Sequence, residues 1–191
     1  MTFRYTNQKG EAYYLHKGTG KKAGSQYSFS RKEAGTPVKS IPKGYEIYEN
    51  ANGRVFLRKS VPKKITQGEV SIVENCIRQY AKIKDYKVDV KGRAITIYLP
   101  DLEINELKSC FESFVLVNHS LLDKSLKNIL TYSPIMRFIL DDEKQREFRV
   151  ERAGFADPDD EWLLLEGGND LQKLAKRYCR HLGKDFFYDL I

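Results

Sequence analysis

The stretch Tyr45-Glu-Ile-Tyr-Glu-Asn-Ala-Asn-Gly-Arg-Val-Phe-Leu-Arg58 gives the strongest local signal for the fold. Two runs rich in aromatic and β-branched residues flank an Asn-Gly pair, which favours a β-hairpin. The sequence leaves open whether the loop has two or four residues. Side chains alternate along a strand, so in either register Arg54, Phe56 and Arg58 share one face. Val55 and Leu57 then share the other face.

The charge of the chain is concentrated around this hairpin. Residues 3–64 hold 14 Lys and Arg against 4 Asp and Glu, a net charge of +10, whereas residues 65–191 hold 19 against 22, a net charge of −3. This division, together with the linker Lys59-Ser-Val-Pro-Lys-Lys-Ile-Thr66, predicts two parts. They are a basic β-rich module over residues 1–64 and an α+β body over residues 65–191. The sequence pI of about 9.2 suits an anionic partner.

The rest of the basic module also has β character. Phe3–His16 contains a turn at Asn7-Gln-Lys-Gly10 between β-prone runs and predicts another hairpin, and Tyr27–Arg31 alternates as a further strand. Between them, Lys17–Ser25 holds three glycines and three lysines. A nucleoside-triphosphate loop needs Gly, four residues, then Gly-Lys-Ser/Thr, and that spacing fails here. We therefore predict a hairpin tip that carries charge.

The body begins with a clear helix signal. Thr66 followed by Glu69 is typical of a capping box, and the apolar residues of 70–81 recur with helical spacing. The remaining patterns predict hairpins over 86–99 and 134–152, mostly helix over 102–130 with a break near 118–120, a short buried strand at 162–165, a helix from the cap Asn169 to Leu182, and a last helical turn at 186–191. Antiparallel hairpins with about three to four helices indicate the α+β class.

No catalytic or metal motif survives a check of its spacing. Asp101 with Glu106 and Lys108 resembles a compressed metal-nuclease signature, but five residues cannot form the paired strands that such a site needs. The acidic segment 157–161 lacks the central Gly and distant Glu of an EF-hand, which favours a solvated loop. The histidines have no partners at catalytic or metal spacing, and only His16, beside the lysine-rich loop, merits a test. We expect no metal and no cofactor.

The cysteines and the absence of apolar segments bear on location. Cys76, Cys110 and Cys179 are odd in number and lie in helical patterns, which indicates buried thiols in a reducing compartment. No apolar run approaches 18 residues, and the N-terminus has no apolar leader segment. We therefore expect a cytoplasmic protein with no membrane partner.

Basic residues interleaved with aromatic ones suggest a non-catalytic nucleic-acid-binding accessory protein, because single strands bind cationic grooves with aromatic platforms. One alternative is a protein–protein adaptor, which would dock an acidic partner on the basic module or use its apolar C-terminal segment. The other is a metal-dependent nuclease whose site is dispersed in sequence. DNA against RNA, partner identity and oligomeric state stay open. The residues expected at the contact surface are Lys17, Lys21, Lys22, Arg31, Lys32, Arg54, Phe56, Arg58 and Lys59.

Overall fold

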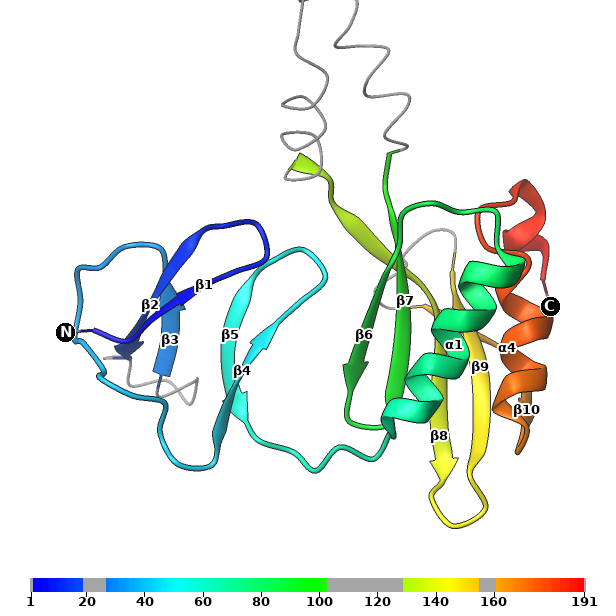
Figure 1. Ribbon diagram of the computed structural model, residues 1–191, viewed down its shortest axis with the longest axis horizontal. Helices are drawn as coiled ribbons and strands as arrows, with labels where there is room; N and C mark the ends of the chain where they lie inside the picture. The colour runs from blue at the N-terminus through cyan, green and yellow to red at the C-terminus, as the bar shows by residue number, and fades with distance from the viewer. Residues whose placement is uncertain (1, 19–26, 103–128, 155–160, 191) are drawn as a thin grey trace, which may run out of the picture. The chain divides into compact units, whose positions relative to one another are not determined.

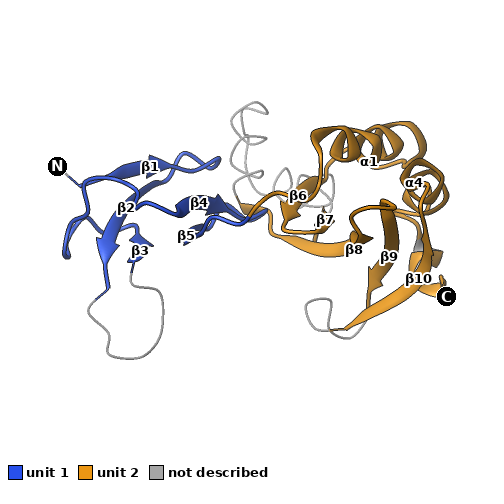
Figure 2. Ribbon diagram, turned by 90° about the horizontal axis from the view of Figure 1, so that it is seen from below, with its two compact units in different colours: residues 1–61 blue, residues 62–191 orange. Residues whose placement is uncertain are grey.

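The computed structural model describes residues 2–18, 27–102, 129–154 and 161–190. The chain divides into two compact units, Met1–Val61 and Pro62–Ile191, drawn in different colours in Figure 2. We call them unit 1 and unit 2 and treat each by itself.

Unit 1 is built from antiparallel strands (Figure 1). β1 (Arg4–Thr6), β2 (Ala12–Lys17) and β3 (Tyr27–Ser30) form a three-stranded sheet in that order. β4 (Tyr45–Glu49) and β5 (Val55–Lys59) form a separate two-stranded hairpin, and β5 lies next to β3. The two hairpins and the strand predicted from the sequence are present in these places.

The core of unit 1 is small and partly polar. Tyr13 and Leu15 of β2 are buried, as are Val55 and Leu57 of β5. Asn7 is buried too, and its side-chain amide donates to the carbonyl of Gly53 at 2.6 Å, while its Oδ1 accepts the backbone N–H groups of residues 9 and 11. A buried amide satisfied in this way ties the β1–β2 turn to the β4–β5 loop.

The β4–β5 loop has neither two nor four residues. The backbone N–H of Asn50 donates to the carbonyl of Arg54 at 3.0 Å, which leaves Ala51-Asn-Gly53 as the loop. Gly53 has a φ of +78° and donates to the carbonyl of Asn50 at 2.9 Å. A turn followed by a left-handed glycine is the usual three-residue hairpin connection. It pairs Glu49 with Val55 and so fixes every cross-strand pair below it.

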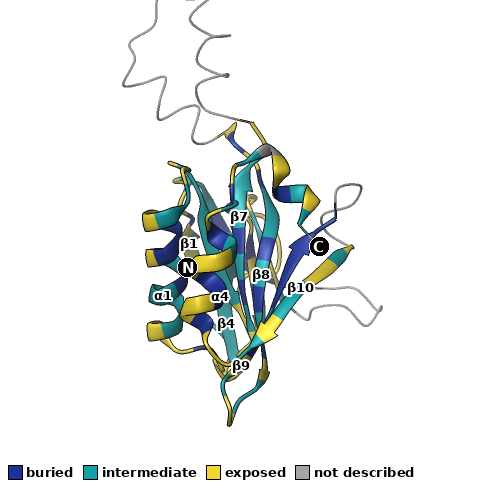
Figure 3. Ribbon diagram, turned by 90° about the vertical axis from the view of Figure 1, so that its right-hand side faces the viewer, coloured by how far each residue is buried: buried dark blue, intermediate teal, exposed yellow. Residues whose placement is uncertain are grey.

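The described residues of unit 2 form an antiparallel sheet of five strands in the order β10-β9-β8-β7-β6. Among the described residues, the α-helices α1 and α4 lie on the same face of this sheet (Figures 2 and 3). This arrangement confirms the α+β class. In chain order the described elements of unit 2 are α1 (Gln67–Tyr80), β6 (Lys87–Lys91), β7 (Ala94–Pro100), β8 (Tyr132–Asp142), β9 (Glu147–Ala153), β10 (Trp162–Gly168), α4 (Leu171–Cys179) and the 3-10 helix η1 (Asp185–Asp189).

The core of unit 2 lies between the helices and the sheet. Alternate residues of the inner strands point into it, and α1 and α4 contribute residues with helical spacing. α1 also packs along α4. The core residues that are at most 2% exposed are Val73, Ile77, Ile95, Ile97, Met136, Phe138, Leu140, Phe148, Val150, Ala175, Cys179, Leu182 and Phe187.

Several sequence predictions need correction. The number of helices is not confirmed: the described residues hold two α-helices and η1, and the helices expected in 102–130 fall almost entirely on residues 103–128, outside the described part. The cap of α4 is Asp170, whose carboxylate accepts the N–H of Lys173 at 2.9 Å, and not Asn169. The strand at 162–165 is not buried, because β10 is the edge of the sheet, where Leu164 is 62% exposed.

Candidate nucleic-acid interface

The outer side of the β4–β5 hairpin brings together several residues of the predicted contact surface. Glu46 lies opposite Arg58, and Tyr48 lies opposite Phe56. Arg54 precedes this pair on the chain, and it shares the face of Phe56 by strand alternation. Val55 and Leu57 are buried on the other side. We call the face formed by Glu46, Tyr48, Arg54, Phe56 and Arg58 the ladder face.

The ladder face presents a row of flat groups. The rings of Tyr48 and Phe56 are stacked with their centroids 6.2 Å apart and an interplanar angle of 29°. The guanidinium of Arg58 lies 4.1 Å from the centroid of the Tyr48 ring, and its Nε donates to Glu46 at 2.8 Å. Phe56 is 46% exposed at the other end of the row. An exposed ring that stacks on a neighbouring ring is suited to stack on another planar group as well.

The opposite side of the hairpin is anchored in unit 1. The carboxylate of Glu49 accepts the hydroxyl of Tyr5 at 3.0 Å and the backbone N–H of Gln8 at 2.8 Å. Burial raises the pKa of the Tyr5 hydroxyl, and its hydrogen bond to Glu49 raises it further. The ring of Tyr45 meets that of Tyr27 edge-on at 5.6 Å. These contacts hold the hairpin against the three-stranded sheet, so the ladder face is pre-positioned.

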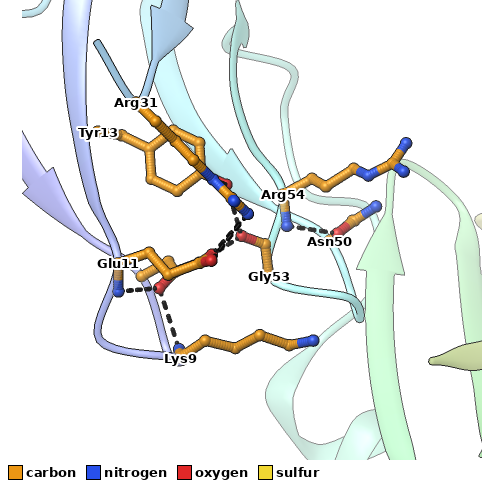
Figure 4. A network of polar contacts seen from close by, with 8 residues as sticks. Lys9, Glu11, Tyr13, Arg31, Asn50, Gly53 and Arg54 are labelled. Carbon is orange, nitrogen blue, oxygen red and sulfur yellow. Dashed lines mark hydrogen bonds and ion pairs between the residues drawn. The ribbon is translucent and has the colours of Figure 1, made fainter. Parts of the chain in front are cut away.

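Arg31 has a structural role inside unit 1. Its Nη2 lies 2.8 Å from the carboxylate of Glu11, and its Nε donates to the Tyr13 hydroxyl at 3.4 Å. Figure 4 shows the guanidinium crossing the Tyr13 ring toward Glu11, near the carbonyl of Gly53. The hydrogen bond to Tyr13 and the charge of Glu11 raise the pKa of Arg31. Its side chain is still 64% exposed, so it keeps a solvent-facing surface.

The remaining predicted residues are placed less tightly. Lys17 at the end of β2, Lys32 and Arg54 are exposed, while Lys59 is exposed on the face of β5 opposite to Phe56. The backbone N–H of Arg54 donates to Asn50 Oδ1 at 2.9 Å, which leaves its side chain outside this turn (Figure 4). Lys21 and Lys22 lie outside the described residues.

Besides Glu46, sequence reasoning missed Tyr48 as a member of the ladder face. Its partner depends on the loop length, and only the three-residue loop sets it opposite Phe56. A loop of four residues would have paired it with Val55, on the buried side of β5. The glycine after Asn52 was the available signal, because a left-handed residue at that place is typical of the three-residue connection.

The other candidate sites of the sequence resolve into structural roles. His16 is 6% exposed, and its Nε2 lies 2.9 Å from the carbonyl of Lys32. Asp101 accepts the hydroxyl of Thr131, whereas Glu106 and Lys108 lie outside the described residues. Burial raises the pKa of the Cys76 thiol, and Cys76 and Cys179 are both buried and free. Among the described residues no group of three His, Cys, Asp or Glu could hold a metal ion.

Comparison with known proteins adds no functional assignment. No protein-family model matches the chain, and neither a curated protein nor a solved structure matches it. Within the described residues, no helix is long and apolar enough to cross a membrane.

Proposed function

We propose that this chain is a non-catalytic nucleic-acid-binding protein that uses the ladder face of unit 1 to bind single strands. The observation that carries this proposal is the exposed Phe56 ring, which stacks on the Tyr48 ring, while Tyr48 in turn contacts Arg58. Aromatic platforms of this kind stack with unpaired bases, and each stacked base contributes about 1–3 kcal/mol. Bases within a duplex do not offer their faces, so a single strand is the form that this surface suits.

The charge of unit 1 supports the same partner. Glu11 and Glu46 neutralise Arg31 and Arg58, so the phosphate contacts fall to residues outside these pairs. Arg54 is the residue that precedes Phe56 on the ladder face. We therefore assign stacking to Phe56, Tyr48 and Arg58 and phosphate binding to Arg54, with Lys17, Lys21, Lys22, Lys32 and Lys59 as further cationic contacts.

Phe56→Ala is expected to weaken binding of single-stranded DNA or RNA by about 5- to 150-fold, which corresponds to about 1–3 kcal/mol for one stacked base. The measurement is fluorescence anisotropy with labelled oligonucleotides, single-stranded and duplex, over a salt series. The variant loses no charge, so the slope of log affinity against log salt should stay unchanged. Phe186→Ala is the matched control, because Phe186 of unit 2 is 47% exposed and equally aromatic.

Variants that remove a charge should, unlike Phe56→Ala, change the slope of log affinity against log salt. Arg54→Ala should reduce the salt slope on single strands by about 0.7, and Lys21→Ala with Lys22→Ala by about 1.4. The reason is that each phosphate contact releases counterions when it forms, so a variant with fewer contacts releases fewer of them on binding. The circular dichroism and thermal midpoint of each variant must match those of the unmodified chain. If the intact chain binds none of the oligonucleotides at low salt, this proposal is refuted and the adaptor alternative takes its place.

A further inference from the structure

One edge of the sheet in unit 2 is apolar and exposed. β10 ends the strand order and has β9 as its single strand neighbour among the described residues. Its first four residues, Trp162-Leu-Leu-Leu165, carry no charge, and Leu163 and Leu164 are 39% and 62% exposed. Figure 3 shows β10 in the colours of exposed and intermediate residues, beside the mostly buried β9. Such an edge is a ready template for pairing with another extended chain.

The opposite edge of the same sheet is protected. β6 has the sequence Lys87-Val-Asp-Val-Lys91, in which charged residues alternate with the valines that pack on the core. Charges on an edge strand, lysines above all, are a common device against unwanted pairing. β10 has a bulge between Leu164 and Glu166, which divides its ladder with β9 into residues 162–164 and 166–168. It lacks the lysines that β6 has.

A basic stripe runs along α4 beside this edge. Lys173, Arg177 and Arg180 are spaced by four and three residues, so they share one side of the helix, and all three are exposed. Arg177 Nη1 donates to the carboxylate of Glu166 on β10 at 2.7 Å, which places this side of the helix toward β10. Lys176 lies on the other side, with its Nζ 5.5 Å from the centroid of the Tyr80 ring of α1.

The two faces of the edge differ in chemistry. Leu164 pairs with Glu151 on the face away from the helices, and on that face the Trp162 ring lies 3.9 Å from the guanidinium of Arg137. On the helix face Glu166 accepts Arg177 and the hydroxyl of Tyr178, the latter at 3.0 Å. A strand added to β10 would therefore meet apolar surface with one set of alternate side chains. The other set would meet the cations of α4.

We infer that the β10 edge of unit 2 binds an extended segment of a partner protein, with alternating apolar and acidic residues, as a sixth strand of the sheet. Main-chain hydrogen bonds supply affinity in this mode, and alternate side chains supply specificity. A second copy of the chain fits less well. Antiparallel β10–β10 pairing would set the α4 stripes of both copies side by side, where their like charges repel. This site is independent of the ladder face in unit 1.

Trp162 makes the inference directly testable, because it is the chain's single tryptophan and lies on β10. The full chain is titrated with the capped peptide Glu-Val-Glu-Leu-Glu-Val-Glu while tryptophan emission and the heat of binding are recorded. We expect saturable binding with a change in emission.

Leu164→Lys should weaken binding of the peptide at least about tenfold. Ile129→Lys should leave it unchanged, because Ile129 is also 62% exposed but lies outside β10. Lys173→Ala should weaken it and reduce its salt dependence.

Other outcomes would overturn this inference. They are an absence of binding, equal binding of a peptide with Lys in place of Glu, or equal affinity for Leu164→Lys and the unmodified chain. Dimerisation in sedimentation that disappears in Leu164→Lys would assign the edge to a second copy instead. Thermal midpoints of the variants establish that they are folded. The Phe56→Ala variant should bind the peptide as tightly as the unmodified chain does. The peptide experiment therefore tests the β10 edge separately from the ladder face.

Discussion

Replacing Leu174 by Ala should lower the free energy of unfolding by about 2–5 kcal/mol. Leu174 is 4% exposed and belongs to the core between the helices and the sheet of unit 2. Its removal deletes buried methyl groups and leaves a cavity that neighbouring side chains fill only in part. The same core includes Cys179 and Phe187, which are at most 2% exposed and tightly enclosed, so little relaxation is available.

Leu163→Ala is the matched control, since it removes the same atoms from the exposed edge strand β10. It should cost less than about 1 kcal/mol, because Leu163 is already 39% exposed. Urea denaturation followed by the emission of Trp162 in unit 2 measures both variants. If Leu174→Ala costs under about half a kcal/mol, the buried face of α4 has been misassigned.

The helices of unit 2 were predictable where periodicity is long and capped. In α1, Val73, Cys76 and Ile77 recur with helical spacing and are buried. The capping box of Thr66 and Glu69 is present as predicted. Short apolar runs carry less information. Trp162–Leu165 has the composition of a central strand, but its position at an edge depends on pairing with β9, and a local pattern does not contain that pairing.

The ladder face shows what alternation along a strand can and cannot give. Alternation alone placed Arg54, Phe56 and Arg58 on one face, in agreement with the burial of Val55 and Leu57 on the other. It could not show that Arg58 is paired, because its partner Glu46 depends on the register across the hairpin. The pair of Arg31 and Glu11 was hidden for a similar reason, since it joins residues 20 apart through the β2–β3 sheet.

The contact between Arg146 and Glu69 joins residues that are 77 positions apart in the sequence, which no local pattern could predict. Arg146 ends the β8–β9 turn with a φ of 51°, which is unusual for a residue other than glycine. Its Nε donates to one carboxylate oxygen of Glu69 at 2.9 Å, and its Nη2 lies 2.5 Å from both oxygens. The same carboxylate accepts the backbone N–H of Thr66 at 2.8 Å. Glu69 thus joins the start of α1 to the sheet.

Glu69→Ala should lower the free energy of unfolding by about 2–3 kcal/mol at neutral pH, because it removes half of the capping box and leaves the guanidinium of Arg146 without its carboxylate. Glu69→Gln is the matched variant, because glutamine also serves at this position of a capping box but carries no charge. It should cost less than the alanine variant. Urea denaturation of the three proteins at pH 7 gives these values.

The effect of Glu69 on stability should depend on pH with a definite sign. Burial alone raises the pKa of Glu69, but hydrogen bonds from Arg146 and Thr66 outweigh it and lower the pKa below its ordinary value of 4.5. A carboxyl whose pKa is lower in the folded chain stabilises the fold fully above its unfolded pKa. This stabilisation is lost as pH falls below the ordinary value and through the folded one.

The difference in unfolding free energy between the unmodified chain and Glu69→Gln should therefore be constant from about pH 6 to 8 and shrink toward about pH 3. Urea denaturation of both proteins across this range measures it. Other carboxyls with a lowered pKa, such as those of Asp142 and Glu143 in the β8–β9 turn, titrate in both proteins. Their contributions cancel in the difference, which isolates Glu69. A difference that stays constant down to about pH 3 would show that the charge of Glu69 beside Arg146 adds nothing to stability, because protonation would then remove nothing.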